Sequence, residues 1–174
     1  MKILTVSLLV AAVALSACTN PNRFGGDDAM AGSGNPTGGQ PLGVVPGSAN
    51  DPNSTAFFNQ TVGDRVLFEV DQSSLTMAGR TTLDGQASWL LANTDYQAVI
   101  EGHADEQGTR EYNLALGARR ANAAQEYLVS RGVPANRLRV VSYGKERPIE
   151  ICSNEACYAK NRRAVTVLAG GLTS

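Results

Sequence analysis

A segment poor in large apolar residues limits how much of this chain can fold. Residues 19–53 consist largely of Gly, Pro, Asn, Ser and Ala, and their few large apolar side chains follow no period. This composition is typical of a flexible tether. About 120 residues follow it, which is enough for one hydrophobic core and not for two. We therefore expect a single globular domain over residues 54–174.

The first residues predict export and a lipid anchor. Residues 1–17 start with Met1-Lys2, a short positive region, and continue as an almost purely apolar run that is too short to span a bilayer comfortably. The sequence Leu15-Ser16-Ala17-Cys18 resembles the lipobox of bacterial lipoproteins, which implies cleavage before Cys18 and lipid on its thiol. An ordinary secretory signal with a chance cysteine is the alternative. Thr19 stands where an aspartate tends to retain lipoproteins in the inner membrane, so the resemblance implies the outer membrane, a tether over residues 18–53 and a domain facing the periplasm.

The two remaining cysteines are close together in the sequence. Cys152 and Cys157 bracket a short loop, and exported proteins meet an oxidising compartment, so we expect a disulfide. Their spacing is not that of a redox-active pair. A metal site needs more ligands nearby, and the one histidine, His103, is distant. We expect a bridge that fixes a local turn, and neither a metal nor a cofactor.

The charge pattern argues against nucleic acid as a partner. The formal net charge is -1, which gives the whole chain no electrostatic attraction to a polyanion. From Arg119 onward basic residues are in excess. A solvated face explains most of them, and a polyanion or peptide site is the alternative.

Strand and helix patterns alternate through the globular part. Strands are expected over residues 65–70, 96–101, 137–143 and 163–168, and helices after Thr76, between Thr109 and Gly132, and over residues 155–160. The predicted fold class is α/β, a two-layer βαβαβαβ sandwich with helices packed on one face of a sheet. Inward-facing helix positions are expected at Leu83, Ala87, Leu90, Leu91, Leu114, Gly117, Ala121, Ala124 and Leu128.

A polar cluster surrounds the start of the long second helix. A carboxylate at a strand end, Asp105, and a guanidinium on the following helix can hold the ammonium and the carboxylate of a small zwitterion. Asn113 and Arg120 are seven positions apart and lie within about 20° of each other around the helix. Arg119 points about 100° away from Arg120, so only one of these arginines can serve the same ligand.

Short motifs in this region stand in the order and spacing of the OmpA-like C-terminal domain family. The resemblance covers about residues 64–169, and with the lipobox and tether it points to the lipoprotein members that bind peptidoglycan. The motifs are Val66-Leu67-Phe68, Glu101-Gly102-His103-Ala104-Asp105, Gly108-Thr109, Tyr112-Asn113-Leu114, Leu116-Gly117, Arg119-Arg120-Ala121, Ser142-Tyr143-Gly144-Lys145-Glu146 and Asn161-Arg162-Arg163.

The resemblance implies non-covalent binding of peptidoglycan through meso-diaminopimelate in its stem peptide. Asp105 matches the aspartate that takes the ammonium of this residue, and Arg120 matches the arginine that takes its carboxylate. Asn113 matches a supporting asparagine. Asp71 matches a pocket position that is often Asn, and an ionised Asp can only accept hydrogen bonds. We expect the Asn161-Arg162-Arg163 motif to close the last strand beside the pocket, with direct ligand contact as the alternative.

The resemblance also implies protein partners and no catalysis. Lipoprotein members join the Tol system, which serves envelope integrity and cell division. They bind TolB through a surface that overlaps the pocket and would here include Glu106. The competing class is a cell-wall hydrolase using His103 and Asp105, but one histidine and no positioned nucleophile disfavour an enzyme. We expect His103 to be a buried or partly buried brace, and Ala at Asp105 or Arg120 to abolish binding without changing circular dichroism.

Overall fold

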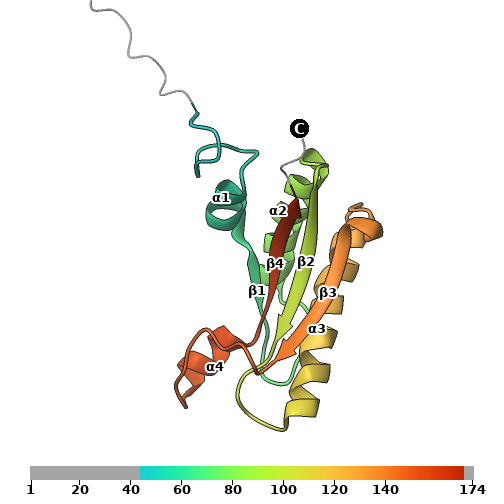
Figure 1. The fold of residues 1–174 in the computed structure, drawn as a ribbon. Coiled ribbons are helices and arrows are strands. Elements are labelled where there is room, and N and C mark those ends of the chain that lie inside the picture. Colours follow the sequence, from blue (N-terminus) through green and yellow to red (C-terminus); the bar gives the residue numbers. More distant parts are fainter. Residues whose placement is uncertain (1–43, 171–174) are drawn as a thin grey trace, which may run out of the picture. The chain divides into compact units, whose positions relative to one another are not determined.

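The computed structural model describes residues 44–170. The expected signal over residues 1–17, the expected lipid on Cys18 and the tether up to residue 43 lie outside the described residues. A mixed sheet and four α-helices make up the fold (Figure 1). The strands are β1 (Arg65–Leu67), β2 (Tyr96–His103), β3 (Leu138–Gly144) and β4 (Arg163–Gly170), and the helices are α1 (Thr55–Phe57), α2 (Met77–Ala92), α3 (Arg110–Ser130) and α4 (Glu155–Asn161).

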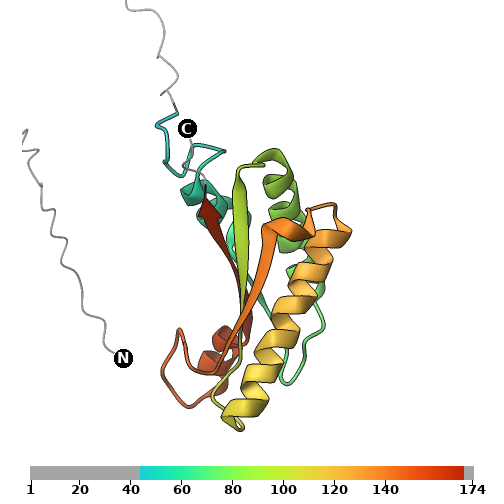
Figure 2. The same ribbon diagram turned by 45° about the vertical axis from the view of Figure 1, so that its right-hand side comes forward.

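The strands lie side by side in the order β1-β4-β2-β3. β2 pairs parallel with β3, whereas β4 lies antiparallel to both β1 and β2. Figure 2 shows α3 running along the sheet, with α2 beside it on the same face. The expected two-layer α/β sandwich is confirmed. α4 differs, because it lies in the connection between β3 and β4 at the end of the sheet and does not cover the helical face (Figure 1).

Side-chain caps explain where the main helices begin. The Thr76 hydroxyl accepts a hydrogen bond from the backbone N–H of Gly79, and the Thr109 hydroxyl accepts one from that of Tyr112. Each bond satisfies an N–H group that has no partner within the first turn of the helix. After α3, Gly132 adopts φ 98°, a backbone conformation that favours glycine. Both helix starts and the stop at Gly132 were expected from the sequence.

The core lies between the sheet and the two long helices. Alternate residues of β2 face this core, and Ala98 and Ile100 are fully buried there. The helices contribute Leu83, Ala87, Leu90, Ala121, Ala124 and Leu128, all buried. Two expected core positions are wrong: Leu91 and Leu114 are 45% and 48% exposed. Leu91 lies one residue past the buried stripe of α2, and Leu114 borders an open groove beside the edge strand β3.

The residues before β1 attach to the same core. Phe58 is fully buried, and its ring lies 4.9 Å from that of Trp89. The Trp89 indole donates a 2.7 Å hydrogen bond to the carbonyl of Pro52, and the Tyr96 hydroxyl donates one to that of Asn53. Pro52 and Asn53 belong to the last part of the expected tether. The sequence did not predict the helical turns of residues 55–63 that connect them to β1.

The first strand ends earlier than expected, and this opens the loop that forms one wall of the site. β1 stops at Leu67, although the N–H of the buried Phe68 still donates a 2.9 Å hydrogen bond to the carbonyl of Arg162. The chain then leaves the sheet, and Asp71 turns it with φ 56°.

Among residues 44–170, no helix is long and apolar enough to cross a membrane.

Candidate functional site

A pocket of about 270 Å³ lies at the end of the sheet where β2 runs into α3. The loop after β1, the loop between β2 and α3, and the first turns of α3 form its walls. The structure brings together Asp71, Asp105 and Asn113, three of the four residues expected to bind the ligand. The complete lining is Val70, Asp71, Asp105, Gln107, Gly108, Tyr112, Asn113 and Leu116.

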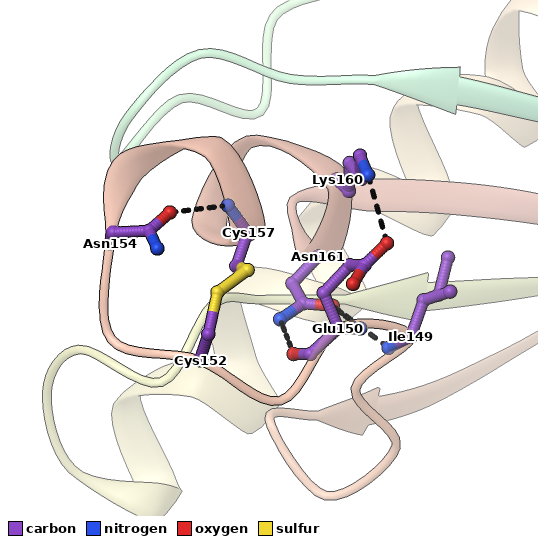
Figure 3. Close-up of a disulfide and its surroundings, with 7 residues drawn as sticks. All are labelled: Ile149, Glu150, Cys152, Asn154, Cys157, Lys160 and Asn161. Carbon is purple, nitrogen blue, oxygen red and sulfur yellow. Dashed lines mark hydrogen bonds and ion pairs between the residues drawn. A yellow bond between two sulfur atoms is a disulfide. The ribbon is translucent and has the colours of Figure 1, made fainter.

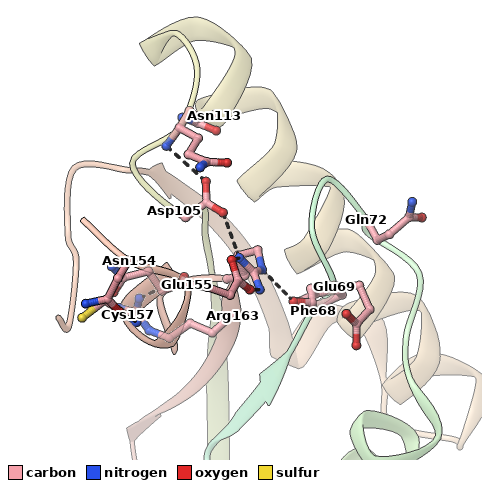
Figure 4. A network of polar contacts seen from close by, with 12 residues as sticks. Phe68, Glu69, Gln72, Asp105, Asn113, Asn154, Glu155, Cys157 and Arg163 are labelled. Carbon is pink, nitrogen blue, oxygen red and sulfur yellow. Dashed lines mark hydrogen bonds and ion pairs between the residues drawn. The ribbon is translucent and has the colours of Figure 1, made fainter. Parts of the chain in front are cut away.

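Asp105 supplies a largely buried carboxylate to this pocket. It is 8% exposed. One carboxylate oxygen, Oδ1, accepts a 3.2 Å hydrogen bond from the backbone N–H of Gln107, and the other, Oδ2, lies 3.2 Å from Nη1 of Arg162. Figure 4 shows this carboxylate between the start of α3 and the polar network behind it. An ionised carboxylate has about four lone-pair positions, so Asp105 can accept further hydrogen bonds from a ligand.

Two side chains hold the loop that follows Asp105. The buried Asn113 donates through Nδ2 to the carbonyl of Gln107 at 2.7 Å, while its Oδ1 accepts no hydrogen bond from the described residues. Lys145 donates to the carbonyl of Gly108, also at 2.7 Å. The loop is thus fixed from α3 and from the end of β3. The free Oδ1 of Asn113 adds a second acceptor to the pocket.

Asp71 closes the opposite wall. It is the only non-glycine residue with positive φ among the described residues, in a region that Asn and Asp tolerate better than most side chains. Its carboxylate accepts a hydrogen bond from the Tyr112 hydroxyl, which joins the loop after β1 to α3. This bond raises the pKa of Tyr112. The sequence interpretation did not assign Tyr112 a role in the site, although the residue lies within one of the family motifs.

Arg120 lies beneath the pocket and does not line it. Its side chain is fully buried, and three backbone carbonyls accept its hydrogen bonds. They are those of Gln72 (Nε, 2.8 Å), His103 (Nη1, 2.8 Å) and Glu69 (Nη2, 3.2 Å). Burial lowers the pKa of Arg120 to about 10, against the opposing effect of Asp105, so the guanidinium is charged at neutral pH. The exposed Arg119 instead lies over the Tyr112 ring at 5.9 Å, which confirms that the two arginines face different sides.

Arg162 is the direct ionic partner of Asp105, which the sequence did not predict. It is 3% exposed. Besides Asp105, its Nη2 lies 2.5 Å from Oε1 of Glu155 on α4, and its Nε donates to the carbonyl of Phe68 at 3.2 Å. Burial lowers the pKa of Arg162, but the hydrogen bonds with Glu155 and Asp105 outweigh it and raise the pKa above its usual value. Arg162 thus connects the pocket, β1 and α4.

The neighbouring residues of the same motif organise the loop before α4. Asn161 is fully buried; its Oδ1 accepts from the N–H of Ile149, and its Nδ2 donates to the carbonyl of Glu150 (Figure 3). Arg163 donates to the carbonyl of Arg147 at 3.1 Å. These contacts are structural, as expected for a motif that closes the last strand. In the same loop Cys152 and Cys157 form the expected disulfide, with their Cα atoms 6.0 Å apart.

His103 is a buried brace, as expected. It is 1% exposed, its ring stacks on that of Tyr143 at 5.6 Å, and neither ring nitrogen makes a hydrogen bond within the described residues. Burial, followed by the positive charges of Arg163 and Arg147, lowers the pKa of His103 to about 4, so the ring is neutral at pH 7. Its side chain makes no hydrogen bond with Asp105.

Comparison with known proteins shows the family of the chain. Residues 67–162 match the OmpA family. The chain belongs to this family. The peptidoglycan-associated lipoprotein of Rhizobium meliloti (strain 1021) is 49% identical over 162 residues, which cover 93% of this chain and 85% of that protein. The protein of the same name from Brucella melitensis biotype 1 is 53% identical over 129 residues, covering 74% of this chain and 76% of the relative.

Two solved structures have the same fold. The crystal structure of the peptidoglycan-associated lipoprotein from Burkholderia pseudomallei superposes with a TM-score of 0.62 at 37% identity, over 70% of this chain and 98% of that one. The C-terminal domain of Helicobacter pylori MotB reaches a TM-score of 0.59 at 21% identity, over 63% of this chain and 86% of its own. The second likeness concerns the fold alone.

Proposed function

We propose that this chain is an outer-membrane lipoprotein whose periplasmic domain binds peptidoglycan non-covalently and without catalysis. Relatives that match 93% and 74% of this chain carry the name peptidoglycan-associated lipoprotein, which supports binding to the cell wall. The observation that carries the proposal is the Asp105 carboxylate, fixed by Gln107 and Arg162 and open to the pocket. A carboxylate held in this way is suited to an ammonium group in the stem peptide.

The proposed ligand is the diaminopimelate residue of the stem peptide, which ends in an amino acid zwitterion. Asp105 accepts its ammonium, and Asn113 Oδ1 and Asp71 offer further acceptors. The ligand carboxylate interacts with the charge of Arg120. Each terminal nitrogen of Arg120 carries two N–H groups and uses one of them on a backbone carbonyl, so one N–H on each remains for a ligand. Because Arg120 is fully buried, direct contact with the ligand requires residues 69–72, whose carbonyls it binds, to shift when the ligand binds.

The lipid on Cys18 and the tether supply the other end of the proposed anchor. Together with the pocket they would hold the outer membrane to the cell wall. We also propose that the domain binds TolB as part of the Tol system, through a surface that includes Glu106, the residue between Asp105 and Gln107 of the pocket. Because the two surfaces overlap, TolB and peptidoglycan would exclude each other. This exchange connects the proposed anchor to envelope integrity and cell division.

Co-sedimentation with purified sacculi tests the binding proposal. Asp105→Asn keeps the shape of the side chain and removes its charge, so we expect binding to diaminopimelate-type sacculi to weaken at least about tenfold. Asp95→Asn removes an exposed carboxylate far from the pocket and serves as the control. Equal binding of the two variants would reject the role of Asp105. Release of soluble fragments by the wild-type protein would indicate a hydrolase and would reject the non-catalytic proposal.

A further inference from the structure

Three ionised side chains form a continuous chain behind the pocket. Arg162 lies between two carboxylates: its Nη1 is 3.2 Å from Oδ2 of Asp105 and 3.4 Å from Oε2 of Glu155, and its Nη2 is 2.5 Å from Oε1 of Glu155. The shorter contact is therefore with Glu155. We propose that Glu155, by neutralising Arg162, leaves Asp105 with the negative charge that selects a cationic group in the ligand. This inference rests on the proposed function of the pocket.

The need for such a residue follows from the charges alone. A carboxylate paired with one guanidinium is close to neutral and attracts a ligand ammonium weakly. Beneath the pocket Arg120 adds a second positive charge that acts on both Asp105 and Asp71. With Glu155 present, the network has three carboxylates and two guanidinium groups. They are those of Asp71, Asp105 and Glu155, and of Arg120 and Arg162. Without Glu155 the charges of the remaining four side chains balance, and the attraction of the pocket for a cation is weaker.

Burial makes this charge effective at the pocket. The side chains of Arg162 and Asp105 are 4% and 10% exposed, so water and salt screen their interaction little. The Glu155 side chain is 67% exposed and reaches Arg162 from the solvent side. Glu155 does not line the pocket. It acts through Arg162, which makes it a positioning residue.

The local structure fixes Glu155 in place. It is the first residue of α4, whose N-terminus is capped by the Asn154 side chain, which accepts a 3.2 Å hydrogen bond from the N–H of Cys157. The Cys152–Cys157 disulfide closes the segment on both sides of Glu155. In Figure 4, Glu155 lies between the first turn of α4 and the Asp105 carboxylate. Its pKa is lowered by the hydrogen bond with Arg162, so it is ionised at neutral pH.

Calorimetric titration of the purified full-length protein in detergent tests the role of Glu155. The probe is a soluble muropeptide whose diaminopimelate amine is free, and we expect Glu155→Gln to bind it about three- to tenfold more weakly than wild type. Glu155→Asp retains the charge and should bind within about twofold of wild type. Glu150→Gln is the matched control, because Glu150 is in the same loop but pairs with Lys160.

Two further measurements separate charge selection from a structural role. With the amine of the same muropeptide acetylated, wild type and Glu155→Gln should bind equally, because no ammonium remains to be selected. Added salt should reduce the difference between them for the free amine. A loss that is equal for both peptides and independent of salt would overturn the inference, as would equal binding by Glu155→Gln and Glu150→Gln. If wild type binds neither peptide, the proposed function itself fails.

Discussion

Gly102 on β2 and Gly117 on α3 bring the backbones of strand and helix into direct contact. A Cβ on Gly102 would overlap the carbonyl oxygen of Gly117, and a Cβ on Gly117 would lie 2.8 Å from the carbonyl oxygen of Gly102. Only glycine at both positions permits this approach. Asp105 follows the strand residue closely, and Asn113 lies one helical turn before Gly117. The contact therefore sets the distance between the two acceptors across the pocket.

Alanine at Gly102 should push α3 away from the sheet. We expect Gly102→Ala to lower the free energy of unfolding by about 3 kcal/mol, because the backbone on both sides must move. Gly85→Ala is the control: Gly85 lies in α2, and its Cβ would meet Val62 Cγ1 at an ordinary 3.5 Å. That variant should be neutral or more stable by about 0.5–1 kcal/mol. Urea denaturation measures both, and equal stabilities would contradict the close-contact explanation.

Arg120 should be needed for folding as well as for binding. Arg120→Ala leaves the backbone carbonyls of Glu69, Gln72 and His103 without their donors in a buried site. We expect about 3–5 kcal/mol lower stability, in the range for breaking a buried charged network. Arg119→Ala, on the exposed side of α3, should stay within about 0.5 kcal/mol of wild type. Equal thermal unfolding midpoints for the two variants would refute the structural role.

The structural role of Arg120 changes how a binding assay on Arg120→Ala should be interpreted. The sequence suggested that Arg120→Ala would leave circular dichroism unchanged. The structure instead predicts a strongly destabilised domain, so lost binding in this variant would not by itself show a ligand contact. Arg120→Lys keeps a positive charge but cannot reach three carbonyls in the same geometry, and it should fall between wild type and Arg120→Ala in stability. Binding per folded molecule is therefore the quantity to compare.

Site features formed by residues close together in the sequence could be predicted, and contacts between distant residues could not. Asn113, Arg119 and Arg120 share one helix, so helical phase predicted that Arg120 lies on the same side as Asn113 and that Arg119 faces another side. Hydroxyl caps at helix starts are also local and could be predicted. The pair Asp105 and Arg162 joins residues 57 positions apart. Its formation depends on how β2 and β4 pair and on the position of α4, which no local pattern contains.

The same limit explains the errors at Leu114 and in the first strand. Periodicity places Leu114 on the inner side of α3, but the neighbouring strand β3 is at the edge of the sheet and leaves it uncovered. Apolar alternation continues past Leu67, but the chain turns away there because Arg162 and Arg120 bind the carbonyls of Phe68, Glu69 and Gln72. In both cases tertiary contacts decide the outcome.

His103 should make the domain less stable in mild acid. Its pKa is lowered by burial from 6.5 to about 4, so between these values the unfolded chain binds more protons than the folded one. Stability should therefore fall as pH drops from 6.5 towards 4, by up to about 3 kcal/mol. Glu155 and Asp51, whose pKa values are lowered from 4.5 and 3.8, contribute only at the acid end of this window and below it.

Replacing the imidazole isolates this effect. His103→Phe keeps an aromatic ring against Tyr143 and removes the titrating group. We expect its free energy of unfolding to change much less than that of wild type between pH 7 and pH 4.5. Urea denaturation at these two pH values gives the comparison. An unchanged slope in the variant would show that another group is responsible.

Opening the Cys152–Cys157 bridge should weaken ligand binding as well as the fold. The bridge closes a short loop, so its loss removes about 2 kcal/mol on the chain-entropy estimate. The loop contains Asn154, which caps α4, and Glu155, which pairs with Arg162. In a looser loop Glu155 is paired with Arg162 for less of the time, so affinity for the free-amine muropeptide should fall towards that of Glu155→Gln.

Calorimetry on wild type before and after dithiothreitol measures this loss of affinity. The double variant Cys152→Ser with Cys157→Ser should match reduced wild type and should not respond to dithiothreitol. Equal affinity of oxidised and reduced wild type would show that the helix cap alone holds Glu155 in place.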